Sequence, residues 1–299
     1  MAKSAKTPAK GEEKAARTAK GGTGGKTVAK KAASTAAKKP AGKSAAGSSK
    51  KSATSAGKAA PKKAQASRKA GIARPWVEHY PEGIPAEMGD FPNNSLGELL
   101  VDACKTYGDR PAFTCMGKSL SYRDLEEMSQ HFAGYLQSLG LERGARVALM
   151  MPNVLQYPVA MMAVLRAGYV VVNVNPLYTP RELEHQLNDA GAEAIVILEN
   201  FAHTLEAVAS KTSVKHVVVA SMGELLGLKG HIVNFVVRRV KKMVPTWSLP
   251  GHVSFREAVK KGAAHGFRPV EIALSDNAFL QYTGGTTGVS KGATLLHSN

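Results

Sequence analysis

The first 70 residues constrain the fold more than any other stretch, because they contain no Leu, Ile, Phe, Tyr or Trp. They consist almost wholly of Ala, Lys, Ser, Thr, Gly and Pro. A segment of this composition buries too little apolar surface to offset the conformational entropy lost on folding. We therefore predict a disordered Lys/Ala-rich tail over residues 1–72 and a folded region over residues 73–299.

The positive charge of the chain is concentrated in this tail. Of the 40 Lys and Arg residues 19 lie in residues 1–70, against 2 of the 23 Asp and Glu residues, which leaves 21 of each in the remainder. The net charge of +17 is therefore no sign that the folded region binds nucleic acid. Two interpretations of residues 1–70 stay open. In the first, residues 1–70 bind polyanions such as DNA, RNA or anionic lipid nonspecifically. In the second, they form a solvated extension without a partner, or they result from a start codon set too far upstream.

The sequence lacks the signals of several classes of protein. No apolar stretch in the tail could serve as a secretory signal, and the longest apolar runs fall well short of the roughly 20 residues that span a bilayer. Cys104 and Cys115 match no metal or redox spacing, and Glu184-His185 lacks the second histidine of a zinc motif. This cysteine usage favours a reducing cytoplasm and predicts no protein-held metal.

Capping signals predict the first helices of the folded region, which we expect to begin near Pro75. Ser95 and Glu98 form a capping box before apolar residues at helical spacing that end at Gly108. Two short strands are expected around Gly117, followed by a helix over residues 122–139.

From Arg146 onward, strand-like and helix-like segments alternate. Strands are predicted at 146–151, 169–175, 194–198 and 216–220, and helices at 153–168, 181–190 and 201–210. Thr179, Pro180 and Glu182 supply the start signals of the second of these helices. Alternation of this kind predicts an α/β fold with doubly wound, mostly parallel sheet units.

Residues 229–244 read as a basic amphipathic helix. The apolar stripe of this helix consists of Val233, Val236, Val237, Val240 and Val244. The cations at its C-terminal end are Arg238, Arg239, Lys241 and Lys242. We favour a surface helix that packs the valine stripe on the domain and places its cations at its own C-terminal dipole. The alternative is a helix that lies on an anionic membrane.

The segment "YTGGTTGVSKG", residues 282–292, follows a strand-like run and combines glycines, hydroxyls and a lysine. Glycines expose backbone N–H groups and hydroxyls add donors, so the loop can cradle phosphate oxygens, with Lys291 as the mobile cation. The P-loop pattern fails in every register. Residues 288–292 match the hydrolase motif G-x-S-x-G, but no acid follows them, so we treat that match as accidental.

The whole stretch "YTGGTTGVSKGA" resembles the phosphate loop of the adenylate-forming enzymes. The segments "RVALMMPNVLQYPVA", "LRAGYVVVNVNPLYTPRELEHQLNDAGA" and "NFVVRRVKKMVP" are similar to bacterial long-chain fatty acid CoA ligases. The resemblance runs from about Trp76 to Asn299 and implies the N-terminal part of an AMP-binding (adenylation) domain.

The resemblance implies a two-step reaction in which a long-chain fatty carboxylate attacks the α-phosphate of Mg²⁺-ATP, and CoA then displaces AMP. The residues implied in holding the ATP phosphates are Tyr282, Thr283, Gly284, Gly285, Thr286, Thr287, Gly288, Val289, Ser290, Lys291 and Gly292. They position and neutralise the leaving pyrophosphate and supply no nucleophile. The alternatives are a ligase for another carboxylic acid and a polyanion-binding protein that acts through residues 1–70.

Two departures from the family pattern shape what we expect of this chain. Leu296 stands where the family usually has a threonine, in the turn after the loop. The family's chain also continues for roughly as many residues again, with the acidic Mg²⁺ motif, the ribose-binding aspartate, most of the acyl pocket and the adenylation lysine. We therefore expect an N-terminal fragment that is inactive by itself, from an enzyme located in the cytoplasm or peripherally on the inner membrane.

Overall fold

The structure is a computed structural model that describes residues 73–87, 89, 92–283 and 290–299. The predicted tail, residues 1–72, and the loop residues Gly284, Gly285, Thr286, Thr287, Gly288 and Val289 lie outside the described residues. Residues Arg74–Asn299 group into one compact unit.

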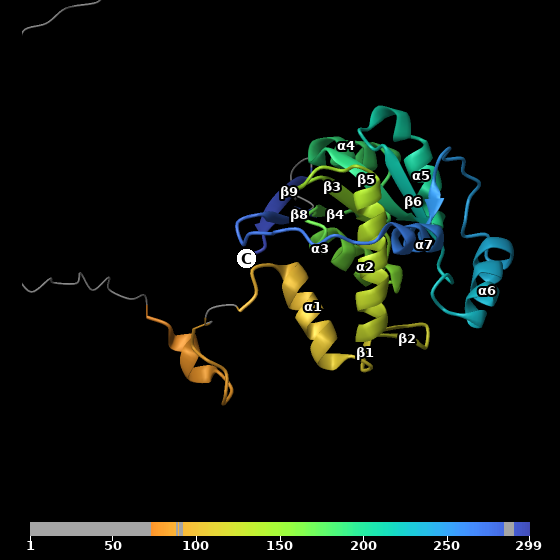
Figure 1. Cartoon of the computed structure of the whole chain (residues 1–299). Helices are drawn as coiled ribbons and strands as arrows, with labels where there is room; N and C mark the ends of the chain where they lie inside the picture. Colours follow the sequence, from red (N-terminus) through yellow and green to blue (C-terminus); the bar gives the residue numbers. More distant parts are fainter. Residues whose placement is uncertain (1–72, 88, 90–91, 284–289) are drawn as a thin grey trace, which may run out of the picture. The chain divides into compact units, whose positions relative to one another are not determined.

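This unit combines seven α-helices with nine strands among the described residues (Figure 1). The α-helices are α1 (Leu96–Tyr107), α2 (Tyr122–Ser138), α3 (Gln156–Arg166), α4 (Pro180–Ala190), α5 (Ala202–Glu206), α6 (Leu228–Phe235) and α7 (Phe255–His265). Short helical turns are η1 (Pro75–His79), η2 (Glu199–Phe201), η3 (Ala209–Lys211) and the π-helical η4 (Val236–Val240). The strands are β1 (Pro111–Cys115), β2 (Lys118–Ser121), β3 (Arg146–Met150), β4 (Val170–Asn173), β5 (Ala192–Leu198), β6 (His216–Ala220), β7 (Val253–Ser254), β8 (Asn277–Thr283) and β9 (Lys291–Leu296).

Seven of these strands form one mixed sheet in the order β7-β6-β5-β3-β4-β8-β9. Every neighbouring pair is parallel except β8 and β9, which form an antiparallel hairpin at the edge. The remaining two strands, β1 and β2, pair separately as a hairpin whose turn residues Met116 and Gly117 both have positive φ. The predicted α/β fold with mostly parallel strands is confirmed.

Helices cover both faces of the sheet, so its central strands are apolar on both sides. Along β5, Val196 packs in the cluster with α2, α3 and α7, whereas its neighbours Ile195 and Ile197 pack in the cluster with α4 and α5. A parallel strand buried on both faces reads as a continuous apolar run, which is why "AIVIL" shows no alternation of polar residues.

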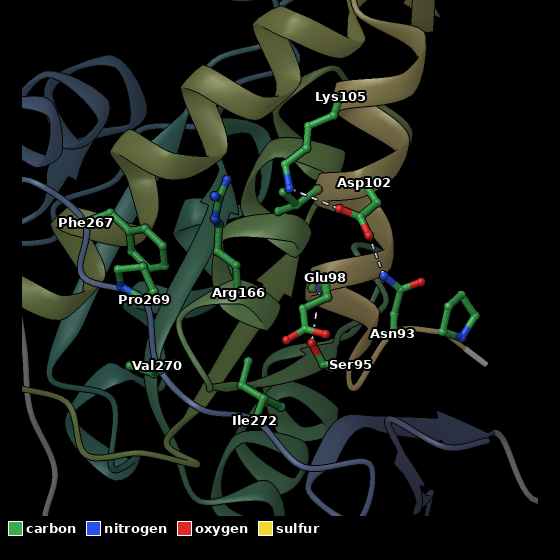
Figure 2. A pocket seen from close by; sticks show the side chains of 13 residues that line it. Asn93, Ser95, Glu98, Asp102, Lys105, Arg166, Phe267, Pro269, Val270 and Ile272 are labelled. Atoms are coloured by element: carbon green, nitrogen blue, oxygen red, sulfur yellow. Dashed lines mark hydrogen bonds and ion pairs between the residues drawn. The ribbon is translucent and has the colours of Figure 1, made fainter. Parts of the chain in front are cut away.

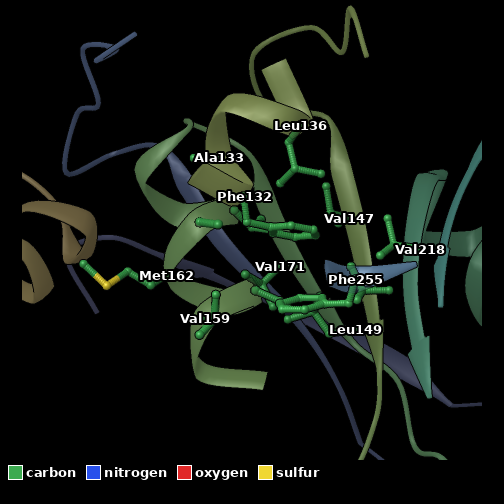
Figure 3. Close-up of a cluster of buried hydrophobic side chains, with 14 of the residues drawn as sticks. Phe132, Ala133, Leu136, Val147, Leu149, Val159, Met162, Val171, Val218 and Phe255 are labelled. Carbon is green, nitrogen blue, oxygen red and sulfur yellow. The ribbon is translucent and has the colours of Figure 1, made fainter. Parts of the chain in front are cut away.

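Two aromatic rings anchor the cluster on the α2 face (Figure 3). Phe132 of α2 and Phe255 of α7 are fully buried, and their ring centroids lie 4.9 Å apart at an interplanar angle of 29°. Val147, Leu149 and Val171 of the central strands pack in the same cluster. The rings therefore join two helices to the sheet that they cover.

Helices α2 and α7 approach closely because glycines face each other. A Cβ on Gly262 would overlap the carbonyl oxygen of His131, and a Cβ on Gly134 would lie 2.8 Å from the carbonyl oxygen of Gly262. Real Cβ atoms avoid such separations. Only glycine at both positions allows the two backbones to pack at this distance.

The predicted helix starts are confirmed at α1 and α4. The Ser95 hydroxyl accepts from the Glu98 N–H, and Thr179 and Glu182 form a reciprocal capping box. Gly191 ends α4 in the left-handed conformation. The strands predicted around Gly117, and those at 146–151, 169–175, 194–198 and 216–220, also form.

Two predicted helices differ from the structure. The helix expected over 201–210 is limited to α5, with 3-10 turns on either side. The helix expected over 229–244 is α6 followed by the π-helical turn η4, and its valine stripe is not uniformly buried: Val237 is buried, but Val240 is 60% exposed. A five-residue π turn rotates later side chains away from the face that a 3.6-residue period predicts. None of the described helices is long and apolar enough to cross a membrane.

Candidate functional site

The parallel strands of the sheet end at a common carboxyl edge, the edge at which ligands of open α/β sheets bind. The chain leaves β3 for α3, which packs on one face, and leaves β4 for α4, which packs on the other. The switch point of the sheet lies between β3 and β5, because the chain leaves β3 toward β4 in one direction and leaves β5 toward β6 in the other. Strand β8 lies beside β4 and ends at the same edge.

The β8–β9 hairpin brings the described members of the predicted site together here. Thr283, the last residue of β8, is paired with Lys291, the first residue of β9, and both side chains are exposed. Tyr282 is paired with Gly292 one step deeper in the hairpin. The Ser290 hydroxyl donates to the Thr283 carbonyl at 3.1 Å. A hydroxyl and an ammonium group side by side at the end of a strand can bind an anionic oxygen.

A chain of partly buried polar side chains supports the strand ends beneath this hairpin. The Tyr157 hydroxyl of α3 donates to Asn173 Oδ1 of β4 at 2.9 Å, and Asn173 Nδ2 donates to Gln281 Oε1 of β8 at 2.9 Å. Gln186 of α4 donates to the Asn173 carbonyl at 2.7 Å. Burial raises the pKa of Tyr157, although the bond to Asn173 opposes this rise. The hydroxyl therefore stays protonated and keeps donating.

Helix α4 contacts both strands of the hairpin. The Tyr282 hydroxyl donates to Asp189 Oδ2 at 2.6 Å, and His185 Nε2 lies 3.2 Å from the Ser290 carbonyl. Burial, and then the hydrogen bond to Asp189, raise the pKa of Tyr282 well above its usual range. The Tyr282 ring is neutral at all physiological pH values and acts as a hydrogen-bond donor.

A separate concavity lies between α1 and the segment 267–272, with a volume of about 420 Å³ (Figure 2). Its charged groups are paired: Asp102 accepts from Asn93 and Lys105, and the buried Arg166 makes a bidentate pair with Glu126. The Arg166 guanidinium also stacks over the Phe267 ring at 4.9 Å. These paired side chains stabilise the fold and are not available to a ligand, so we assign the candidate functional site to the β8–β9 hairpin.

Sequence reasoning found the loop but missed the residues that support it. The sequence predicts Tyr157, Asn173, Gln281 and Asp189 only as members of a helix or a strand, and His185 also as part of an incomplete zinc motif. The signal available was Asn173, a polar residue that interrupts the run "YVVVNV" at the end of a buried strand. The partners of Asn173 come from three other elements, and one sequence does not reveal which elements adjoin.

Comparison with known proteins identifies the family of the chain. The model of the family described as AMP-binding enzyme matches residues 100–299. The long-chain-fatty-acid–CoA ligase of Salmonella typhimurium (strain LT2) is 57% identical over 226 residues, which cover 75% of this chain and 40% of the ligase. The chain thus spans about two fifths of the length of that curated relative.

Two solved structures share the fold. A long-chain-fatty-acid-CoA ligase from Archaeoglobus fulgidus superimposes with a TM-score of 0.55 at 26% identity, over 73% of this chain and 39% of that one. An anthranilate CoA ligase in complex with anthranoyl-AMP gives a TM-score of 0.56 at 18% identity, over 68% of this chain and 35% of the other. The second likeness shows the fold alone. Because the family model matches well over half of the sequence, this chain belongs to the AMP-binding enzyme family.

Proposed function

We propose that the full-length protein, of which this chain is the N-terminal part, activates long-chain fatty acids to acyl-CoA through an acyl-adenylate, at the expense of ATP. The observation that carries the proposal is the pairing of Thr283 with Lys291 at the carboxyl edge of the sheet. The identity of 57% to the Salmonella ligase favours a long-chain fatty acid as the substrate. Residues 73–299 act as the N-terminal part of the adenylation domain, and residues 1–72 as an appended tail.

Residues 282–292 are proposed to hold the ATP phosphates. When a fatty carboxylate attacks the α-phosphorus, the bond to the bridging oxygen breaks, and pyrophosphate leaves with the electron pair. The Lys291 ammonium and the Thr283 hydroxyl stabilise the charge that develops on this leaving group. They need no proton transfer, because their contribution is electrostatic and positional. CoA then attacks the acyl carbon in the second step and releases AMP.

Mg²⁺ is proposed to arrive with ATP as part of the substrate. Among the residues that the structure describes, no group of three or more His, Cys, Asp or Glu could hold a metal ion. Asp189 contacts the hairpin, but its carboxylate already accepts a hydrogen bond from the Tyr282 hydroxyl. In this chain the phosphates themselves are therefore the ligands that Mg²⁺ would meet.

The principal alternative is a ligase for a different carboxylic acid. An anthranilate CoA ligase has the same fold, so the fold does not select the acid. Exchange assays with fatty acids of several lengths, benzoate and anthranilate decide between the two. Higher turnover with an aromatic acid than with any fatty acid would overturn the long-chain assignment.

Replacement of Lys291 tests the proposed function. In the full-length enzyme, we expect Lys291→Ala to slow ATP–pyrophosphate exchange by roughly a hundredfold, comparable with the loss of one transition-state donor in other enzymes. Lys291→Arg should recover part of the rate, since it keeps the charge. The matched control is Lys260→Ala, an exposed lysine of α7. An exchange rate for Lys291→Ala equal to that of the control would remove Lys291 from the mechanism.

We also propose that α6 docks on an anionic membrane surface. Leu228, Ile232 and Phe235, spaced by four and three residues on one helical face, are 89%, 66% and 61% exposed. The exposed cations Arg239, Lys241 and Lys242 follow in the next turns. Apolar side chains that face water beside basic ones are typical of helices that lie at a lipid interface. The docking face is thus Leu228, Ile232 and Phe235, in place of the valine stripe.

The tail, residues 1–70, is proposed to bind polyanions nonspecifically. Its 19 basic residues against 2 acidic ones provide the charge, and the balanced remainder of the chain does not. Binding of this kind is independent of catalysis and adds a second location or partner to the enzyme.

A further inference from the structure

We propose that helix α4 positions the phosphate-binding residues, with Asp189 and His185 holding one strand each of the β8–β9 hairpin. Asp189 fixes the residue before Thr283, and His185 fixes the residue before Lys291. Neither side chain touches ATP, so both are positioning residues. The inference rests on the proposed function and extends it to a second element.

The first contact is built around Tyr282. Its ring lies across Gly292, where a Cβ would come within 2.9 Å of the ring edge, and its hydroxyl reaches Asp189 at 2.6 Å. The glycine therefore makes room for the ring, and the ring carries the hydroxyl to α4. This arrangement assigns Tyr282 and Gly292 to positioning. Thr283, the residue after Tyr282, is then held at the end of β8.

The second contact holds the other strand. The Ser290 carbonyl lies 3.2 Å from His185 Nε2, and because a carbonyl only accepts, this nitrogen carries the proton. The Ser290 hydroxyl donates to the Thr283 carbonyl at 3.1 Å. Ser290 thus joins α4 to both strands, and the adjacent Lys291 begins β9 from a fixed point.

Helix α4 is suited to this task because it is itself held firmly. Its start is a capping box, Leu183 and Leu187 are fully buried, and Gln186 bonds the Asn173 carbonyl of β4. Contacts from a rigid element place a catalytic group more accurately than contacts from a loop. Small displacements of such groups lower rates strongly, so loss of an α4 contact should weaken the use of ATP without loss of the fold.

The test compares Asp189→Ala, Tyr282→Phe and the double variant with wild type, all in the full-length enzyme. Each single variant should raise the KM for ATP in pyrophosphate exchange about five- to tenfold, the effect of about one net hydrogen bond, and leave the KM for fatty acid and CoA unchanged. The double variant should be no worse than the singles, because both remove the same bond. Asp189→Asn, which keeps an acceptor, should recover most of the affinity.

Matched controls come from elsewhere in the fold. Asp109→Ala removes an exposed carboxylate paired with Arg123, and Tyr169→Phe removes a hydroxyl bonded to the Leu141 carbonyl. Both should leave the KM for ATP unchanged. Hydrogen exchange of the 299-residue chain gives a readout that needs no nucleotide: Asp189→Ala and His185→Ala should speed exchange in β8 and β9 and leave β3 and β5 unchanged.

The outcomes separate this inference from the proposed function. A full-length wild-type enzyme that neither binds ATP nor exchanges pyrophosphate, with variants that still loosen β8 and β9, would overturn the function and leave the α4 contacts standing. A wild-type protein that is active, with variants that match it in KM for ATP and in hydrogen exchange, would overturn the positioning role. A uniform rise in all three KM values would mean a general structural effect and would also overturn it.

Discussion

His297 is a buried histidine that the fold holds in its neutral form. It is 5% exposed, and its Nδ1 accepts a hydrogen bond at 3.1 Å from the N–H of Leu96, the first residue of α1. A protonated Nδ1 could not accept this bond. Burial accordingly lowers the pKa of His297 from its usual value of 6.5, although Asp276 opposes the shift.

This histidine predicts a pH dependence of stability. Above about pH 6.5 it is neutral in both states, but below that pH the unfolded chain takes up a proton that the folded chain resists. The free energy of unfolding should therefore fall as the pH drops from about 6.5 toward the lower folded-state pKa. Urea unfolding between about pH 5 and 7.5 measures this slope.

His297→Gln should flatten the slope, because an amide oxygen can accept the Leu96 hydrogen bond and does not titrate. His231→Gln is the control, since His231 is exposed on α6. Equal slopes in wild type and His297→Gln would mean that another group causes the acid sensitivity.

Individual capping residues were predictable, whereas the polar network was not. Thr179 and Glu182 act within three residues of each other, so the local sequence contains the whole interaction. Asn173 and Gln281 are 108 residues apart, and their contact depends on β8 inserting beside β4. Local rules therefore identified the caps and the loop but not the residues that support the loop.

At the scale of elements, the contact between α2 and α7 predicts an unusual response to alanine. Gly262→Ala would raise intrinsic helix propensity by about 1 kcal/mol. It should nevertheless destabilise the protein by about 1–3 kcal/mol, because its Cβ would overlap the His131 carbonyl and separate the helices. Thermal or urea unfolding measures the difference.

The neighbouring position supplies the control. Ala263 is exposed on α7, and Ala263→Gly should cost only the propensity term of about 1 kcal/mol. Increased stability of Gly262→Ala would show that the two helices can separate without loss of packing.

The exposed face of α6 predicts binding to vesicles. The chain should cosediment with vesicles that contain phosphatidylglycerol and not with neutral phosphatidylcholine vesicles, and salt should weaken the binding. Ile232→Asp combined with Phe235→Asp should abolish binding in a chain without residues 1–70. Leu177→Asp, which changes an isolated apolar residue that is 81% exposed, is the control. Unchanged binding of the double variant would exclude α6 as the docking face.

Elements with complete local signals were predicted well, and the others were not. The helix over 96–107 has a cap, an apolar period and a glycine stop, and it forms as expected. The turn η4 has π geometry, which a fixed period of 3.6 residues does not predict. The hairpin strand β9 is exposed along most of its length, so it has no buried apolar face to reveal it.

At the scale of the whole molecule, the class of fold followed from the alternation of strands and helices, but the order of the strands did not. The sequence places β8 after β7, yet the two strands lie at different positions of the sheet, with four strands between them. The position of β8 depends on how the helices and strands of the whole domain pack together, which no single segment of the sequence reveals. The functional family was predictable because its glycine-rich loop is contiguous in sequence.

The uneven charge of the molecule predicts that binding to polyanions and catalysis are separable. In the full-length enzyme, deletion of residues 1–70 should leave ATP–pyrophosphate exchange unchanged and abolish binding to double-stranded DNA in gel shifts. The DNA affinity of the whole chain should fall steeply with salt, as counterion release requires. A loss of exchange activity after deletion would make the tail part of the catalytic unit.

The insertion of β8 beside β4 also sets an order of events during synthesis. The ribosome adds about 5–20 residues per second, so Gln281 emerges roughly 5–20 seconds after Asn173, its partner 108 residues earlier. Until then the apolar strand β4 forms an open edge of the nascent sheet, where chaperones or other nascent chains can bind. The proposed nucleotide site is thus among the last parts of this chain to assemble, and errors in translation timing should affect ATP binding before they affect the core.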